Sequence, residues 1–173
     1  KKDIKNIISR RKKILNLNFD NPQIMGVLNI TPDSFSDGGL FFSRTKAYKQ
    51  AKNIIESGTA IVDIGGESTR PGSKTINEKV EWKRVKSIIE VLKRKFPKIV
   101  LSLDTRKSYV MENGIKKGIG IINDVSGLNF DKKSFDLINL TKTPFILHHM
   151  QGFPNTMQLR PTYKDALLDV YDF

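Results

Sequence analysis

The segment AIVDIGGESTRPGSKTINEKVEWKRVKSIIEVLKRKFPKIVLSLD, residues 60–104, contains two apolar runs separated by a loop and an amphipathic stretch. The runs Ala60–Ile64 and Ile99–Leu103 are short and nearly uninterrupted, which is typical of parallel strands covered on both faces. Between them, Asn77 can cap a helix that extends to about Lys95. The segment therefore predicts one strand–loop–helix–strand unit of a parallel sheet.

The same unit recurs on both sides of this segment. Within the quoted segment, apolar residues at helical spacing predict the buried side of the helix that follows Asn77: Val85, Ile88, Ile89, Leu92 and Phe96. The other strands are expected at 24–29, 119–123 and 145–149, and the other helices at 43–57, 108–117, 132–140 and from 162 onward. Ser43 is the expected cap of the first of these helices. Five strand–helix units indicate an α/β protein.

Two architectures fit this order. A five-stranded doubly wound sheet would be complete at 173 residues. An eight-fold β/α barrel takes about 250 residues, so the chain would be a barrel truncated after about five βα units. The pattern leaves both open. Residues 1–23 are interpreted as a basic lead-in segment and residues 24–173 as the β/α domain, and both ends of the chain look cut.

The composition excludes several classes of protein. The chain is 38% hydrophobic and 28% charged, which is typical of one soluble globular domain. Without cysteine it can have no disulfide scaffold, no thiolate chemistry and no cysteine-ligated metal. The sequence contains no run of about 18 apolar residues, so it predicts no transmembrane helix. A cytoplasmic location is the default expectation.

The net charge of +12 raises the question of nucleic-acid binding. Most lysines are scattered along predicted helix faces, and the one dense basic cluster, residues 10–13, lacks the interleaved aromatics of single-strand binders. We therefore favour a solvated basic surface over a nucleic-acid interface, and expect no nucleic-acid or membrane partner. The positive field would attract small anionic substrates.

Polar side chains gather at the carboxyl ends of the predicted strands: Asn29, Asp63, Asp104, Asn123 and His149. A single Asp after a strand is usually a turn or cap residue. Five strands that each bring a polar group to the same rim indicate a binding site, because both architectures place their sites at this rim.

Two long loops follow the first two strands. Residues 29–39 form a flexible, hydrogen-bonding loop that is either an ordinary surface loop or a functional lid. Residues 65–72, GGESTRPG, place hydroxyl groups beside Arg70, whose guanidinium suits phosphate or carboxylate, and the alternative is a solvated loop. The spacing matches neither a P-loop nor a dinucleotide fingerprint.

The remaining rim residues suit a nitrogen heterocycle and a metal. Asp104 and Asn123 offer acceptors for ring N–H and exocyclic amine groups. The neutral oxygen of Asn29 suits Mg²⁺, which keeps most of its waters and uses substrate phosphates as ligands. The residues alone thus predict a phosphorylated heterocycle bound with Mg²⁺.

Five blocks in this order resemble the dihydropteroate synthase family. Over residues 24–163 they are LNITPDSFSDGG (28–39), GGESTRPG (65–72), SLDTRK (102–107), INDVSG (122–127) and HMQGFPNTMQ (149–158). The resemblance implies a transferase with the (β/α)8 barrel fold. It would join 6-hydroxymethyl-7,8-dihydropterin diphosphate to p-aminobenzoate, releasing diphosphate and 7,8-dihydropteroate. It further implies a need for Mg²⁺, competition by sulfonamides and a homodimeric complete protein.

The resemblance also assigns roles to individual residues. Asn29 matches the metal ligand, and Asp104 and Asn123 match residues that hold the pterin ring, with Asp63 in the same substrate-binding set. Thr69 and Arg70 match substrate-contacting and catalytic residues of the second loop. In the first loop, Asp33 is a candidate to stabilise the cationic pterin. Phe35 and Pro71 would help to form the p-aminobenzoate pocket.

The chain also departs from that family. It has no DPGFGFGK-like, SRKS-like or Arg-x-His block, which would carry further pterin-binding, lysine and anion-binding groups. We therefore expect a piece of the synthase that is inactive alone. The alternatives are a pterin-dependent methyltransferase domain, which the two loop strings disfavour, and a non-catalytic pterin-binding protein, which would not need Thr69 or Arg70.

Overall fold

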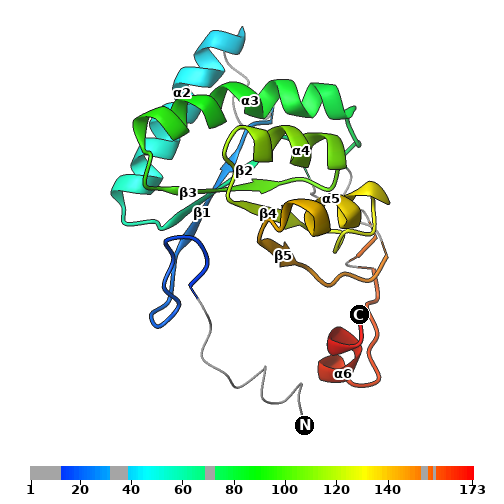
Figure 1. The fold of residues 1–173 in the computed structure, drawn as a ribbon. Helices are drawn as coiled ribbons and strands as arrows, with labels where there is room; N and C mark the ends of the chain where they lie inside the picture. The colour runs from blue at the N-terminus through cyan, green and yellow to red at the C-terminus, as the bar shows by residue number, and fades with distance from the viewer. Residues whose placement is uncertain (1–12, 32–38, 69–72, 153–155, 158) are drawn as a thin grey trace.

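The computed structural model describes residues 13–31, 39–68, 73–152, 156–157 and 159–173. Within these residues strands and helices alternate as expected (Figure 1). The strands are β1 (Met25–Asn29), β2 (Ile61–Gly65), β3 (Val100–Asp104), β4 (Ile121–Asp124) and β5 (Phe145–Leu147). The helices are α2 (Gly39–Glu56), α3 (Glu78–Lys95), α4 (Ser108–Lys116), α5 (Lys133–Thr141) and α6 (Ala166–Tyr171).

The strand order distinguishes the two architectures. All strand pairs are parallel, and the order β1-β2-β3-β4-β5 follows the sequence without reversal. A doubly wound sheet reverses direction at a switch point, whereas a β/α barrel adds strands consecutively. Figure 1 shows α2, α3, α4 and α5 along one face of the sheet, as in the outer layer of a barrel. The fold is the first part of a β/α barrel.

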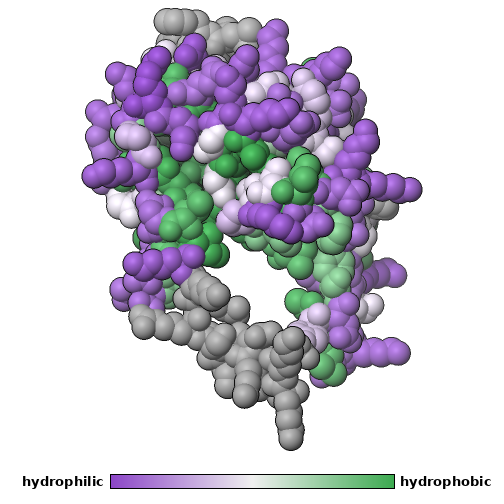
Figure 2. Space-filling model, in the orientation of Figure 1, coloured by the Kyte–Doolittle hydropathy of each residue, from purple (hydrophilic) through white to green (hydrophobic). Residues whose placement is uncertain are grey.

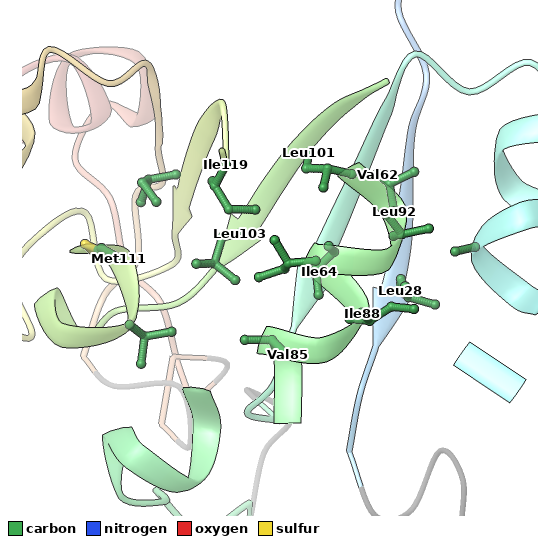
Figure 3. Close-up of a cluster of buried hydrophobic side chains, with 14 of the residues drawn as sticks. Leu28, Val62, Ile64, Val85, Ile88, Leu92, Leu101, Leu103, Met111 and Ile119 are labelled. Carbon is green, nitrogen blue, oxygen red and sulfur yellow. The ribbon is translucent and has the colours of Figure 1, made fainter. Parts of the chain in front are cut away.

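The main core lies between this sheet and its helices (Figure 3). Alternate strand residues point toward the helices: Leu28, Val62, Ile64, Leu101, Leu103 and Ile122. They meet the predicted stripe of α3, of which Val85, Ile88, Ile89 and Leu92 are fully buried and Phe96 partly buried. Asn77 caps α3 by accepting a hydrogen bond from the Lys79 N–H, as predicted.

The opposite face of the sheet changes character along the strands. At its amino end, Leu17 of the lead-in segment packs against Ile61, Val100 and Ile121. Toward the carboxyl end the same face carries polar residues, because strand side chains alternate and the parallel register aligns equivalent positions. The apolar end supports the sheet, and the polar end is available for a ligand.

The sheet edges are more exposed than the apolar runs predict. The strands β2 and β4 are buried throughout, but Val27 of β1 is 53% exposed and Leu147 of β5 is 56% exposed. Among the described strands, each edge strand has a sheet neighbour on one side only. In Figure 2, apolar surface is visible beneath the charged helix layer. Among the described helices, none combines the length and apolar character needed to cross a bilayer.

Four predicted boundaries are wrong by two residues or more, one of them the start of β4, which lies at Ile121 and not at Ile119. The helix α2 begins at Gly39 rather than at Ser43, because serine is tolerated inside a helix at a small cost. The helix α6 begins at Ala166, where Asp165 accepts hydrogen bonds from two backbone N–H groups, while the Thr162 N–H bonds to the side chain of Gln151. The strand β5 ends at Leu147, so it does not include His149.

Candidate functional site

A chain of hydrogen bonds connects three strands at the polar rim. Asn123 of β4 donates through Nδ2 to Oδ2 of Asp63 in β2, over 2.9 Å. On its other side, Oδ1 of Asn123 lies 2.6 Å from Nε2 of His148, which directly follows β5. Asp63 and Asn123 are buried, and His148 is half-buried. The two predicted residues therefore meet, although 60 positions separate them in the sequence.

Burial changes the acidity of Asp63. It raises the pKa of this carboxyl group above its usual range, while the nearby Ser102 hydroxyl, the hydrogen bond from Asn123 and the nearby His148 oppose the change. Ser102 lies close enough to lower that pKa, yet its hydroxyl forms no hydrogen bond of normal geometry. The second carboxylate oxygen, Oδ1, is buried without a partner among the described residues. Asp63 therefore retains an unused acceptor at the rim.

Gly65 leaves a space between two other predicted residues. The register aligns it with Asn29 on one side and Asp104 on the other. A Cβ atom at Gly65 would lie 3.0 Å from Asn29 Oδ1 and 3.5 Å from Asp104 Oδ2. Both oxygen atoms thus border the space above the glycine. Two hard oxygen donors around an open position suit a cation such as Mg²⁺ that completes its shell with water or phosphate.

Asp104 has the properties of a functional carboxyl group. Burial raises its pKa to about 7, and the negative charges of Asp63 and Glu81, among others, act in the same direction. Near neutral pH this group can therefore either donate or accept a hydrogen bond. A strongly shifted carboxyl at the end of a barrel strand is a feature of binding and catalytic sites.

Next to this rim lies an ionic network that the sequence did not reveal. Arg106 donates through Nε to Oε2 of Glu67 over 3.1 Å. Lys107 lies between two carboxylates, 2.9 Å from Glu67 Oε1 and in contact with Glu81. All four side chains are buried, and their formal charges cancel. Burial alone would raise the pKa of Glu67, but Lys107, the backbone N–H of Ile76 and Arg106 hold it below its usual range.

This network holds both stems of the second loop, the segment from Gly65 to Ile76. Glu67 on the first stem accepts from the backbone N–H of Ile76 on the second, over 2.8 Å. Arg106 donates to Thr75 Oγ1, and Ser73 donates to the carbonyl of Ser68. We call these four ionic side chains, Glu67, Glu81, Arg106 and Lys107, the loop clasp. It joins the two described stems of this loop, residues 65–68 and 73–76.

The carboxylate that follows Asn123 has a structural role. Asp124 accepts hydrogen bonds from the backbone N–H groups of Ser126 and Leu128, and so closes the turn after β4. Burial raises its pKa, and these hydrogen bonds oppose the change. Asp131 similarly accepts from the N–H of Ser108 at the start of α4. Asp124 points to the side of β4 opposite to Asn123, because side chains alternate along a strand.

The structure brings together four of the five predicted rim residues: Asn29, Asp63, Asp104 and Asn123. The other predicted site residues lie outside the described residues: Asp33, Phe35, Thr69, Arg70 and Pro71.

The prediction that His149 reaches the rim is wrong. Its ring packs against Tyr163 and Phe173, at centroid distances of 5.7 and 4.8 Å. Its neighbour His148 occupies the rim position instead. Strand alternation carries this signal, because His148 lies two positions after Ile146, which is aligned with Asn123.

Comparison with known proteins identifies the family of this arrangement. Residues 25–173 match the family described as Pterin binding enzyme. The chain is 41% identical over 157 residues to a dihydropteroate synthase of Haemophilus influenzae, covering 91% of this chain and 56% of that protein. It is also 41% identical over 154 residues to the dihydropteroate synthase of Escherichia coli K12, with 89% and 54% covered.

Solved structures agree with these relatives. A Yersinia pestis dihydropteroate synthase in a sulfonamide drug complex superposes with a TM-score of 0.80 at 39% identity, covering 91% of this chain and 56% of that one. The Xanthomonas albilineans enzyme with 4-aminobenzoic acid gives 0.78 at 37% identity, with 91% and 54% covered. The chain spans about half the length of these relatives. From its sequence match and its barrel order, this chain belongs to the pterin-binding enzyme family.

Proposed function

We propose that the complete protein containing this chain is a dihydropteroate synthase. It would join 6-hydroxymethyl-7,8-dihydropterin diphosphate to p-aminobenzoate and release diphosphate and 7,8-dihydropteroate. The observation that carries this proposal is the meeting of Asp63 with Asn123, beside Asp104, at the carboxyl ends of barrel strands. The 41% identity to named synthases supports the same activity.

The rim has the chemistry that a pterin requires. A pterin ring presents ring nitrogens, an exocyclic amine and a carbonyl, so its recognition needs both donors and acceptors. Asn123 offers both, and the unpartnered Oδ1 of Asp63 offers an acceptor. Asp104, with a pKa of about 7, adapts to either role. We assign the pterin ring to these three residues.

Mg²⁺ is proposed to bind at the space above Gly65. Asn29 would hold it, and Asp104 Oδ2 borders the same space. Among the described residues no cluster of three or more His, Cys, Asp or Glu could hold a metal, so protein ligands would be few. This fits Mg²⁺, which keeps several waters and binds substrate phosphates. When bound, the ion would supply positive charge that stabilises the departing diphosphate.

The two loops are proposed to complete the site. Thr69 and Arg70 would bind the diphosphate, for which a guanidinium offers paired N–H donors. Phe35 and Pro71 would line the p-aminobenzoate pocket. In the reaction the C–O bond to diphosphate breaks and its electron pair leaves with the diphosphate. The amine of p-aminobenzoate then forms the C–N bond and loses a proton, and Asp33 would stabilise the cationic pterin carbon beforehand.

The 173-residue chain is proposed to be inactive by itself, because the synthases that it resembles are nearly twice as long. For the complete protein we further propose competition by sulfonamides at the p-aminobenzoate site, a homodimeric state and a cytoplasmic location. Its partners would be the two small-molecule substrates.

An activity assay of the complete protein tests the proposal. We expect diphosphate release that requires Mg²⁺, the pterin diphosphate and p-aminobenzoate together, with 7,8-dihydropteroate formed in equal amount. Pterin binding without diphosphate release would favour the non-catalytic alternative. Transfer of a methyl group from a reduced pterin would favour the methyltransferase alternative, and either result would reject the synthase proposal.

A further inference from the structure

His148 is the last member of the chain of hydrogen bonds that begins at Asp63 and passes through Asn123. Its Nε2 atom lies 2.6 Å from Asn123 Oδ1, a short distance for a hydrogen bond to a neutral amide. Nδ2 of the same amide donates to Asp63. Both ends of the Asn123 side chain are therefore held, one by Asp63 of β2, two strands away, and the other by His148 just after β5. The other histidine, His149, packs against aromatic rings and does not take part.

The chemistry of the three side chains fixes which atom donates in each hydrogen bond. An ionised Asp63 can only accept, so the amide must turn its NH₂ group toward that carboxylate. This orientation leaves the amide oxygen facing His148, and an oxygen can only accept. The His148 ring must then carry a hydrogen on Nε2. A flipped amide would place its oxygen against the carboxylate and its NH₂ against the ring N–H, which is unfavourable at both ends.

We propose that His148 is a positioning residue that locks the Asn123 amide in a single orientation for the pterin ring; this inference rests on the proposed function. One N–H and one lone pair of the amide remain unused after Asp63 and His148 are satisfied. Because the amide cannot flip, the free donor and the free acceptor have fixed directions. A ligand with the opposite arrangement of donor and acceptor would meet like groups.

The role of His148 depends on its Nε2–H and not on its charge. The neutral Nε2–H form and the imidazolium both donate from Nε2, whereas the neutral Nδ1–H form does not. The identity of the tautomer is therefore a direct readout of the proposed hydrogen bond.

Nuclear magnetic resonance of ¹⁵N-histidine-labelled complete protein tests the hydrogen bond without any substrate. The His148 signals are assigned by their loss in His148→Gln. We expect Nε2 to be protonated in the ligand-free protein. A neutral ring protonated on Nδ1 would overturn the proposal, whatever the protein's activity.

Two variants of similar side-chain size then test the positioning role. His148→Gln retains an N–H donor, and His148→Met does not. We expect His148→Met to bind pteroic acid about three- to tenfold more weakly than the wild type, the cost of one neutral hydrogen bond. His148→Gln should stay within about twofold, and the KM for p-aminobenzoate should change in neither variant.

Two results of this comparison would overturn the proposal: unchanged pteroic acid binding by His148→Met, or equal weakening in both variants. If the wild type does not bind pteroic acid at all, the proposed function fails. The tautomer measurement then still decides whether the Asp63–Asn123–His148 chain exists.

Discussion

The carboxyl group of Asp104 links the electrostatics of the rim to the stability of the fold. Its pKa is raised to about 7, first by burial and then by neighbouring negative charges. An unfolded Asp titrates near about 3.9. Between about pH 4 and pH 7 the folded protein therefore binds more protons than the unfolded chain, and the free energy of unfolding falls as the pH rises.

Asp104→Asn should remove this contribution. We expect a flatter pH dependence of the free energy of unfolding and a variant more stable than the wild type at pH 8. Urea unfolding of the complete protein at pH 5 and pH 8 measures both. Asp131→Asn is a control of opposite sign, because the hydrogen bonds to Ser108 and Lys133 hold the pKa of Asp131 below its usual range. Equal pH slopes in the wild type and Asp104→Asn would contradict the assignment.

Gly65→Ala tests the space between Asn29 and Asp104. The added methyl group would press on Asn29 Oδ1, which lies 3.0 Å from the Cβ position. We expect the Mg²⁺ concentration for half-maximal activity to rise about tenfold, as for other groups that orient a ligand. Asn29→Ala should act in the same direction. An unchanged Mg²⁺ dependence in both variants would exclude Asn29 as the metal ligand.

At the scale of whole elements, the loop clasp joins side chains that lie 39 positions apart in the sequence. Glu67→Gln removes one buried charge and leaves Arg106 and Lys107 without a shared partner. Breaking a buried ion pair from one side costs about 3–5 kcal/mol. The exposed pair Lys117–Glu90 is the matched control, because its Nζ to Oε1 distance of 2.9 Å equals that of Lys107 to Glu67. Lys117→Met should cost at most about 1 kcal/mol.

The clasp also predicts how the second loop resists cleavage. Lys74 is exposed and directly precedes Thr75, which Arg106 holds. In native protein, trypsin should cut after Lys74 faster in Glu67→Gln than in the wild type, because the second stem opens more often. Mass spectrometry of brief digests detects this, with cleavage after Lys52 as an internal reference. Equal rates after Lys74 would show that the clasp does not hold the stem.

Local sequence patterns predicted the helices and strands of one segment well, but they missed contacts between distant segments. The apolar runs and the Asn77 cap predicted β2, α3 and β3 to within a residue, because these signals are contained in the segment itself. The clasp was missed because Glu67 and Arg106 are 39 positions apart, and each resembles a solvated charge in its own segment. His148 was missed because strand β5 is short and two histidines stand side by side.

At the scale of the molecule, the sheet formed by the described residues has two open edges. Val27, Phe145 and Leu147 are exposed there, beside a well-packed centre. In a closed barrel such positions are covered by further strands and helices. We therefore expect the 173-residue chain alone to self-associate and to bind a hydrophobic dye, and the complete protein to do neither. Light scattering of both proteins measures self-association, and the fluorescence of the dye measures its binding. A chain that stays monomeric and binds no dye would show that the edges need no cover.

The central claim is that Asp63, Asp104 and Asn123 form a pterin-binding site. A crystal structure of the complete protein with pteroic acid tests it most directly. The pterin ring is predicted to lie at the carboxyl ends of β2, β3 and β4, with hydrogen bonds to Asp104 and Asn123 and with His148 Nε2 still on the Asn123 oxygen. A ring bound elsewhere, with these side chains free of contact, would contradict the account.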